Sequence, residues 1–216
     1  MGEHILSWMT FFPVIGAVVI AFIPASKKEM IKTVAAAAAF VPLVLAVQLY
    51  LNFDRETAGF QFKEHVHWIE AFNIEYFMGI DGLSVPMVLL TAFLSFLCVI
   101  ASWNIDKAVK GYFALFLILE AGMLGVFCAL DFFLFYVFWE VMLLPMYFLI
   151  GIWGAPTRTE PDGRVRGGPY AAIKFFLYTL AGSVLMLLAL IAFYYNVTHP
   201  ETGGHTLNML HIMDQA

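Results

Sequence analysis

The chain has 216 residues, of which 62% are hydrophobic and 12% are charged, and its formal net charge is −5. A soluble globular domain typically carries about 25% charged residues, so this composition excludes an ordinary soluble protein. The 11 basic residues are scattered over short connections and form no basic patch, which excludes nucleic acid as a partner. The lipid bilayer is the expected surrounding.

Six apolar stretches are long enough to cross a bilayer, which takes about 20 residues of helix. Hydrocarbon offers the backbone no hydrogen-bond partner, so the expected fold is an all-α polytopic membrane protein with a single membrane domain. The first stretch follows Glu3 and not a basic segment, so it is expected to stay as a helix and not to be a cleaved signal peptide. In chain order, the expected helices span residues 5–26, 33–53, 82–105, 111–130, 132–153 and 170–195.

The basic residues also predict how the chain is oriented. The other side of the membrane holds only Arg55 and Lys63, whereas the connections after the first, third and fifth helices contain Lys27, Lys28, Lys32, Lys107, Lys110, Arg158, Arg164 and Arg166. Short cytoplasmic loops are enriched in Lys and Arg, so these three connections are expected in the cytoplasm. The amino terminus is then periplasmic, in the inner membrane of a bacterium.

The connection over residues 54–81 is the one long connection on the outer side. Apolar and polar residues alternate along both of its halves, as in two strands, and Glu64 breaks the alternation in the first half. The pattern predicts a β-hairpin on the outer surface. Two strands alone are marginal in water, so a neighbouring protein surface is expected to support the hairpin. The alternative is an interfacial flap that has no partner.

Histidines and cysteines give little sign of a metal or haem site. His65 and His67 would share one face of a strand, but the sequence places no third ligand near them, so no metal is assigned. All six histidines lie outside the expected helices or at their ends, which excludes a haem held between facing helices. Cys98 and Cys128 lie within expected helices and are interpreted as small packing residues. No nucleotide-binding motif is present.

Two acidic residues interrupt otherwise uncharged helices. Glu120 lies 11 residues before Asp131, at the turn between the fourth and fifth helices, and Glu140 lies nine residues after it. At 1.5 Å per residue their depths are about 16 and 13 Å, near the membrane midplane. A charge at that depth costs roughly 2.5–3.5 kcal/mol, so both acids are site hypotheses. The alternative for each is a structural acid that is hydrogen-bonded between helices.

The surroundings of Glu140 suit proton transfer. Tyr136 and Tyr147 are placed on its face of the helix, four residues before and seven residues after it. Pro145 removes a backbone donor beside the acid, which leaves a carbonyl that water can use. A carboxyl group in such a place can take up and release a proton when its surroundings change, as a proton relay requires.

Lys174 is the third candidate for proton transfer. It lies five residues after Pro169, about 7 Å inside the sixth helix, with Tyr170 and Tyr178 on the same face. A buried role and an ammonium group that snorkels to the cytoplasmic surface both fit this position.

Three motifs in order resemble the antiporter-like M subunits of bacterial NADH:quinone oxidoreductase, respiratory complex I, the counterparts of mitochondrial subunit 4. They are Gly79-Ile-Asp-Gly-Leu-Ser84, Phe138-Trp-Glu-Val-Met-Leu-Leu-Pro-Met-Tyr147 and Ala172-Ile-Lys-Phe-Phe-Leu-Tyr178. The resemblance covers the whole chain, and Mrp-type antiporter subunits are relatives of the same family.

The resemblance implies a subunit of the membrane arm that translocates protons, next to other antiporter-like subunits. NAD, FMN, iron–sulfur clusters and quinone would be bound by partner subunits, with no cofactor in this chain. Glu140 matches the fifth-helix glutamate that pairs with a lysine on the seventh helix, Glu120 matches a fourth-helix glutamate, and the hairpin matches an element that links neighbouring subunits. An Mrp-type Na⁺/H⁺ antiporter subunit and a non-pumping structural subunit are the alternatives.

The chain is much shorter than this family pattern. The family has roughly fourteen helices in two inverted repeats, an arrangement in which sites form where the repeats meet. Here the sequence ends at Ala216, after the sixth expected helix, without the family's lysines on helices seven and eight or its charged residue on helix twelve. The chain is therefore expected to be a fragment or one part of a split subunit, which would not move protons alone.

Overall fold

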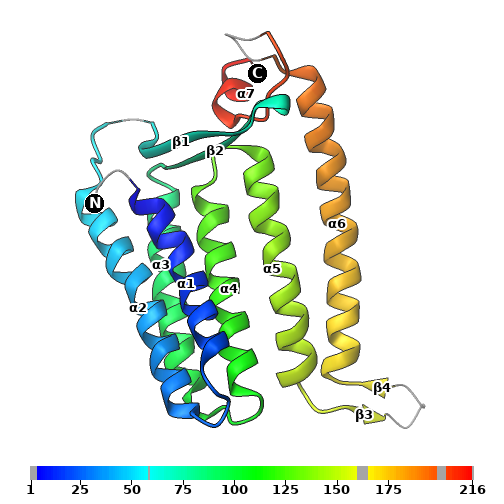
Figure 1. Cartoon of the computed structure of the whole chain (residues 1–216). Coiled ribbons are helices and arrows are strands. Elements are labelled where there is room, and N and C mark those ends of the chain that lie inside the picture. Colours follow the sequence, from blue (N-terminus) through cyan, green and yellow to red (C-terminus); the bar gives the residue numbers. More distant parts are fainter. Residues whose placement is uncertain (1–3, 58, 160–164, 199–202, 216) are drawn as a thin grey trace.

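The computed structural model describes residues 4–57, 59–159, 165–198 and 203–215, which form a bundle of long helices capped at one end by a β-hairpin (Figure 1). Six helices are long and apolar enough to cross a membrane. They are α1 (Ile5–Phe22), α2 (Lys28–Asn52), α3 (Ser84–Ala101), α4 (Val109–Cys128), α5 (Phe132–Trp153) and α6 (Gly168–Asn196). The predicted all-α membrane fold with six spans is confirmed.

Some helix ends differ from the expected ones. The first helix ends at Phe22 and not at residue 26, because Ile23 precedes Pro24 and a residue before proline is forced out of the helical region. The second helix begins at Lys28, five residues before the expected start. Its first turns contain Lys28, Glu29 and Lys32, which an uncharged-run criterion leaves out.

The helices are not packed equally. Among them, α4 contacts α1, α2, α3 and α5, whereas α6 packs chiefly on α5. Two adjoining apolar cores fill the space between α1, α2, α3 and α4, one near the hairpin and one near the other end. Glycine allows α4 to approach α5 closely: a Cβ atom on Gly125 of α4 would lie 2.3 Å from the ring of Phe138 on α5.

The predicted hairpin between the second and third helices is confirmed. Strand β1 (Gln61–Ile69) pairs antiparallel with β2 (Ile74–Ile80), and the single-turn helix η1 (Glu70–Phe72) joins them. The turn is completed by Asn73 in the left-handed region, at φ 49°. The strand register shifts between Gln61 and Glu64, so the break that the sequence showed at Glu64 is a β-bulge.

The hairpin lies across the end of the bundle that also holds the amino terminus (Figure 1). The connection between α4 and α5 extends it, because the Leu130 amide donates to the Phe77 carbonyl at 2.8 Å. The chain after α6 joins on the far side, where the Met209 amide donates to the Leu130 carbonyl at 2.9 Å. This last segment includes a short helix, α7 (Met209–Gln215), which the sequence analysis did not anticipate.

The basic connections lie together at the opposite end of the bundle (Figure 1). There the Lys28 ammonium lies 3.3 Å from Asp106, and the Trp153 indole donates to the Lys107 carbonyl at 2.7 Å. A single-turn helix, η2 (Ser102–Asn104), follows α3, and two short strands, β3 (Arg158–Thr159) and β4 (Val165–Arg166), precede α6. Arg164 lies outside the described residues.

Candidate functional site

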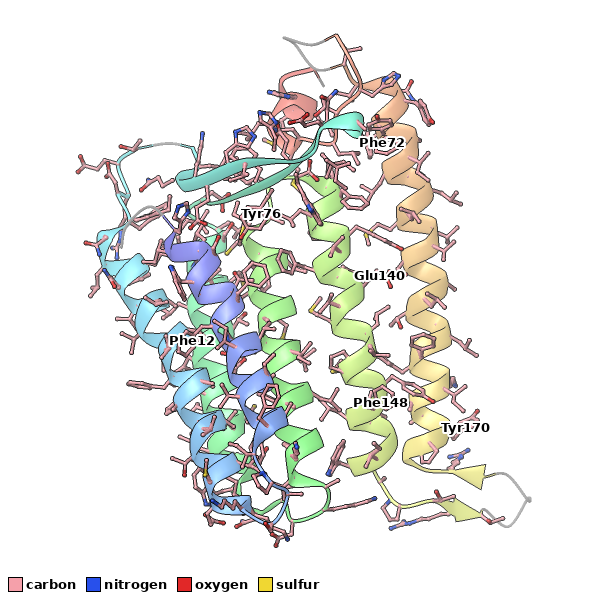
Figure 2. The ribbon with its side chains drawn as sticks, in the orientation of Figure 1. Phe12, Phe72, Tyr76, Glu140, Phe148 and Tyr170 are labelled. Atoms are coloured by element: carbon pink, nitrogen blue, oxygen red, sulfur yellow. The ribbon has the colours of Figure 1, made fainter. Side chains whose placement is uncertain are left out.

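Glu140 lies in the middle of α5, eight residues after Phe132, where the helix begins. Figure 2 shows it at mid-height in the bundle, on the side of α5 that faces α6. The side chain is half-buried, and its Oε1 atom is buried without a hydrogen-bond partner among the described residues. The acid thus lies along the packing line between two helices and not on a fully lipid-facing surface.

Two hydroxyl groups accompany this carboxyl group. The Tyr136 hydroxyl interacts with the Glu140 carboxyl and also with the hydroxyl of Ser183 on α6. Ser183 is buried, and its hydroxyl donates to the Leu180 carbonyl at 3.1 Å. Hydroxyl groups both donate and accept hydrogen bonds, so Tyr136 and Ser183 add polar atoms to an otherwise apolar contact between α5 and α6.

One backbone hydrogen bond of α5 is missing just after Glu140. Pro145 is buried within α5 and has no amide hydrogen, so the carbonyl of Val141 lacks its usual helical donor. Tyr147, the other tyrosine expected on the face of Glu140, packs its ring against Phe176 of α6, with the centroids 5.5 Å apart. On another face of α5, Val137 and Val141 line an apolar groove of about 730 Å³ between α1, α4, α5 and β1.

Glu120 has a different environment. It is fully buried, and neither of its carboxyl oxygens has a hydrogen-bond partner among the described residues. It shares a helix face with Leu117 and Leu124, which belong to the two apolar cores between α1, α2, α3 and α4. A carboxyl group there needs a proton or a nearby cation to offset its charge.

The structure places the two acids at one depth but does not bring them together. Each lies eight residues from the helix end next to the α4–α5 connection, about 12 Å along its helix. Glu140 faces α6, however, and Glu120 faces the core on the other side of α4. Among the described residues, Lys174 forms no ion pair with either acid. It is exposed on α6, six residues after Gly168, as are Tyr170 and Tyr178.

Sequence reasoning missed the role of Glu64. Its carboxylate is buried and accepts hydrogen bonds from the amides of Leu6 at 2.7 Å and Ser7 at 3.2 Å, in the first turn of α1. The Ser7 hydroxyl also lies 2.6 Å from the Tyr76 hydroxyl. Burial, together with the nearby charge of Glu64, raises the pKa of Tyr76 to about 12. The broken alternation at Glu64 was the one signal of an inward-facing acid.

Asp131 holds the start of α5 in a similar way. Its carboxylate accepts from the amides of Phe133 at 2.8 Å and Leu134 at 3.1 Å. Burial raises the pKa of Asp131 to about 6, although hydrogen bonds from the backbone amides of Leu134 and Phe133 oppose that rise.

The sequence matches known protein families over most of its length. Residues 8–130 match the family described as NADH-ubiquinone oxidoreductase chain 4, amino terminus. Residues 129–213 match the membrane domain described as NADH:quinone oxidoreductase/Mrp antiporter. NADH-quinone oxidoreductase subunit M of Rhodobacter capsulatus is 42% identical over 197 residues, which are 89% of this chain and 36% of that protein. NADH-ubiquinone oxidoreductase chain 4 of Arabidopsis thaliana is 38% identical, over 95% of this chain and 39% of that protein.

Solved structures show the same fold at lower identity. A chain of respiratory complex I from Thermus thermophilus with bound NADH aligns with a TM-score of 0.76 at 22% identity, over 97% of this chain and 39% of that one. A chain of the Mrp complex from Dietzia sp. DQ12-45-1b aligns with a TM-score of 0.67 at 21% identity, over 93% of this chain and 20% of that one.

The chain therefore spans about two fifths of the length of the curated relatives it matches. The chain 4 match covers residues 8–130, more than half of the sequence. The two family matches meet at the α4–α5 connection and together take in all six membrane helices. The chain belongs to the NADH-ubiquinone oxidoreductase chain 4 family, whose bacterial members are named subunit M.

Proposed function

We propose that the chain acts as an antiporter-like, proton-translocating subunit in the membrane arm of respiratory complex I. Its partners are the other membrane-arm subunits, including neighbouring antiporter-like subunits. NADH oxidation and quinone reduction take place in those partner chains, which bind the NAD, FMN, iron–sulfur clusters and quinone. Membership of the chain 4 family supports this assignment.

One observation carries the proton-transfer part of the proposal. Glu140 is an ionisable group at mid-membrane depth, on the packing line between α5 and α6, with the hydroxyl of Tyr136 beside it. An acid at that depth is costly and persists mainly where it faces protein or water, so a proton-carrying role explains its presence. Glu120, at the same depth, is proposed as a second proton carrier.

The proposed mechanism uses a change of charge near Glu140. A lysine on a further helix of the whole subunit approaches the carboxylate and favours the ionised form. When that lysine moves away, the carboxyl group takes up a proton, which the neighbouring hydroxyl groups and water pass along a hydrated axis in the middle of the membrane. Electron transfer in the partner subunits drives the movement.

The orientation follows from charge. The basic connections are assigned to the cytoplasm, and the hairpin and amino terminus to the periplasm, because short cytoplasmic loops are enriched in Lys and Arg. The proposed location is the inner membrane of a bacterium.

The test replaces Glu140 with Gln in the whole assembled complex and measures proton pumping per NADH oxidised. We expect pumping to fall to about a tenth or less, since a positioned proton-transfer group typically contributes 10²- to 10⁴-fold. Glu70→Gln, on the exposed hairpin turn, is the matched control and is expected to pump normally. Unchanged pumping in Glu140→Gln would reject the role.

An Mrp-type Na⁺/H⁺ antiporter subunit is the second candidate, because the fold of the Mrp complex chain is similar and the matched membrane domain includes Mrp antiporters. Sodium transport in membranes that lack a quinone reductase would favour it. A purely structural subunit predicts instead that both midplane acids tolerate amide replacement.

A further inference from the structure

Two histidines and one acid meet on the hairpin. His65 and His67 lie on the same face of β1, and Glu75 lies on β2 directly opposite His67. The Glu75 Oε1 atom is 3.1 Å from His65 Nε2 and 3.7 Å from His67 Nδ1. One ligand atom from each of the three side chains lies within 4.8 Å of the other two. The strand register thus supplies the third ligand that the sequence did not reveal.

The acid of this trio is held in place. Glu75 is 2% exposed, and its second oxygen, Oε2, accepts a hydrogen bond of 2.7 Å from the side-chain amide of Asn208. Asn208 is itself buried, in the segment that packs behind the hairpin. A carboxylate fixed on one oxygen by such a bond presents the other oxygen in a constant direction, as supporting partners of metal ligands do. The other oxygen of Glu75, Oε1, lies next to the two imidazole rings.

We propose that His65, His67 and Glu75 form a binding site for a divalent transition metal, with Zn²⁺ as the preferred ion. Zn²⁺ binds imidazole nitrogen and carboxylate oxygen at about 2.0–2.2 Å, which places tetrahedral ligand atoms about 3.3 Å apart. The separations from Glu75 Oε1 to the two imidazole nitrogens in the structure, 3.1 and 3.7 Å, are close to that spacing.

Small movements complete the site. The side chains of His65 and His67 are 44% and 69% exposed and their ring centroids are 5.4 Å apart, so small ring rotations bring their nitrogens toward a common centre. The same exposure leaves the fourth tetrahedral position open to water or to a ligand from another chain. Two nitrogen donors make Mg²⁺ and Ca²⁺ unsuitable, because these ions prefer oxygen ligands.

A bound ion would connect the two strands through their side chains. An isolated two-stranded hairpin is marginally stable in water. A metal that binds only the folded arrangement shifts the equilibrium toward that arrangement. The hairpin that carries the site lies at the end of the bundle that holds the amino terminus (Figure 1).

The experiment uses the full-length subunit in its purified assembly, freed of metal with a chelator and then dialysed against Zn²⁺ alone. Elemental mass spectrometry gives the zinc bound per complex. We expect the wild-type protein to bind one more equivalent than a His65→Asn/His67→Asn variant. The single change His67→Asn is expected to weaken that equivalent at least about tenfold, since even loss of a supporting partner costs 10- to 100-fold.

His4→Asn is the matched control. His4 is an exposed histidine at the same end of the bundle and lies 3.8 Å from the buried acid Glu64, but it has no second imidazole in that pair. The control should bind zinc like the wild-type protein. Equal zinc content and affinity in the wild-type protein and the double variant would overturn the proposal, as would an equal loss in His4→Asn. Both histidines of the site are exposed, so neither change should prevent assembly.

Discussion

Acidic side chains near the hairpin hold the first turns of three helices. Asp81 accepts from the amides of Leu83 and Ser84 at the start of α3, Asp131 caps α5, and Glu64 caps α1. The amino-terminal end of a helix carries unpaired amide groups and a partial positive charge, so a carboxylate is stabilising there. The first two acids can be predicted from local sequence, whereas Glu64 is 58 residues from Leu6, so no local pattern connects them.

Asp81 gives a stability prediction. Partial burial alone would raise its pKa, but hydrogen bonds from Ser84 and Leu83 outweigh burial, and the pKa of Asp81 lies below its ordinary value. Replacing it with Ala should lower the free energy of unfolding by about 1 kcal/mol, as for other helix caps. A carboxyl group whose pKa is lowered by folding stabilises the fold at pH values above its ordinary pKa. This contribution is lost as the pH falls through the pKa of the folded state.

The measurement is thermal unfolding of the detergent-solubilised subunit between neutral and acidic pH. The difference between the wild-type protein and Asp81→Ala should be present at neutral pH and shrink on acidification. Glu56→Ala, at an exposed position in the preceding loop, should unfold like the wild-type protein. A difference that stays constant with pH would count against the capping role of the carboxylate.

Among the elements, the packing of α4 on α5 depends on glycine. A Cβ atom on Gly125 would lie 2.3–2.5 Å from three ring atoms of the buried Phe138. Gly125→Ala should therefore destabilise the subunit by about 1–3 kcal/mol, as overpacking of a core does. Thermal unfolding checks it against Gly111→Ala in the same helix, where the added Cβ atom would make an ordinary 3.7 Å contact with Trp153. Equal stability of the two variants would contradict the close packing.

Most elements could be predicted from the sequence, for clear physical reasons. Uncharged runs of membrane length can satisfy the backbone only as helices, and alternation over residues 61–80 indicates strands. The short helix α7 was not predicted because seven residues show too little hydrophobic periodicity. The start of α2 was not predicted because charged residues occupy its first turns. The meeting of His67 and Glu75 depends on the strand register, which the turn at Asn73 sets.

At the scale of the whole molecule, α6 is only partly covered. It packs chiefly on α5 and leaves a long apolar surface exposed, which includes Leu177, Leu185 and Leu188 at 58–67% exposure. Lys174 lies on this helix among exposed residues. The sequence could show that Glu120, Glu140 and Lys174 are costly in a membrane. It could not show which side of its helix each one faces, because that is decided by how the helices pack.

Lys174→Met tests the role of the exposed amine. The curated relatives are more than twice as long as this chain, and we propose that a further helix of the assembled complex covers the open surface of α6. We predict that Lys174→Met lowers proton pumping per NADH oxidised severalfold, because the variant removes a positive charge that such a covering helix would bury. Lys63→Met, at the hairpin end, should pump normally. Full pumping by Lys174→Met would mean that the amine reaches the cytoplasmic surface and takes no part in coupling.

Because α6 packs chiefly on one helix, α5, a movement of α6 would affect Glu140 and Glu120 differently. A tilt of α6 away from α5 would change the surroundings of the Glu140 carboxyl group, because α6 packs chiefly on α5 and Glu140 lies on the side of α5 that faces it. The same tilt would not change the surroundings of Glu120, because its face of α4 packs in the apolar cores between α1, α2, α3 and α4. The position of α6 thus affects the surroundings of Glu140 and leaves those of Glu120 unchanged.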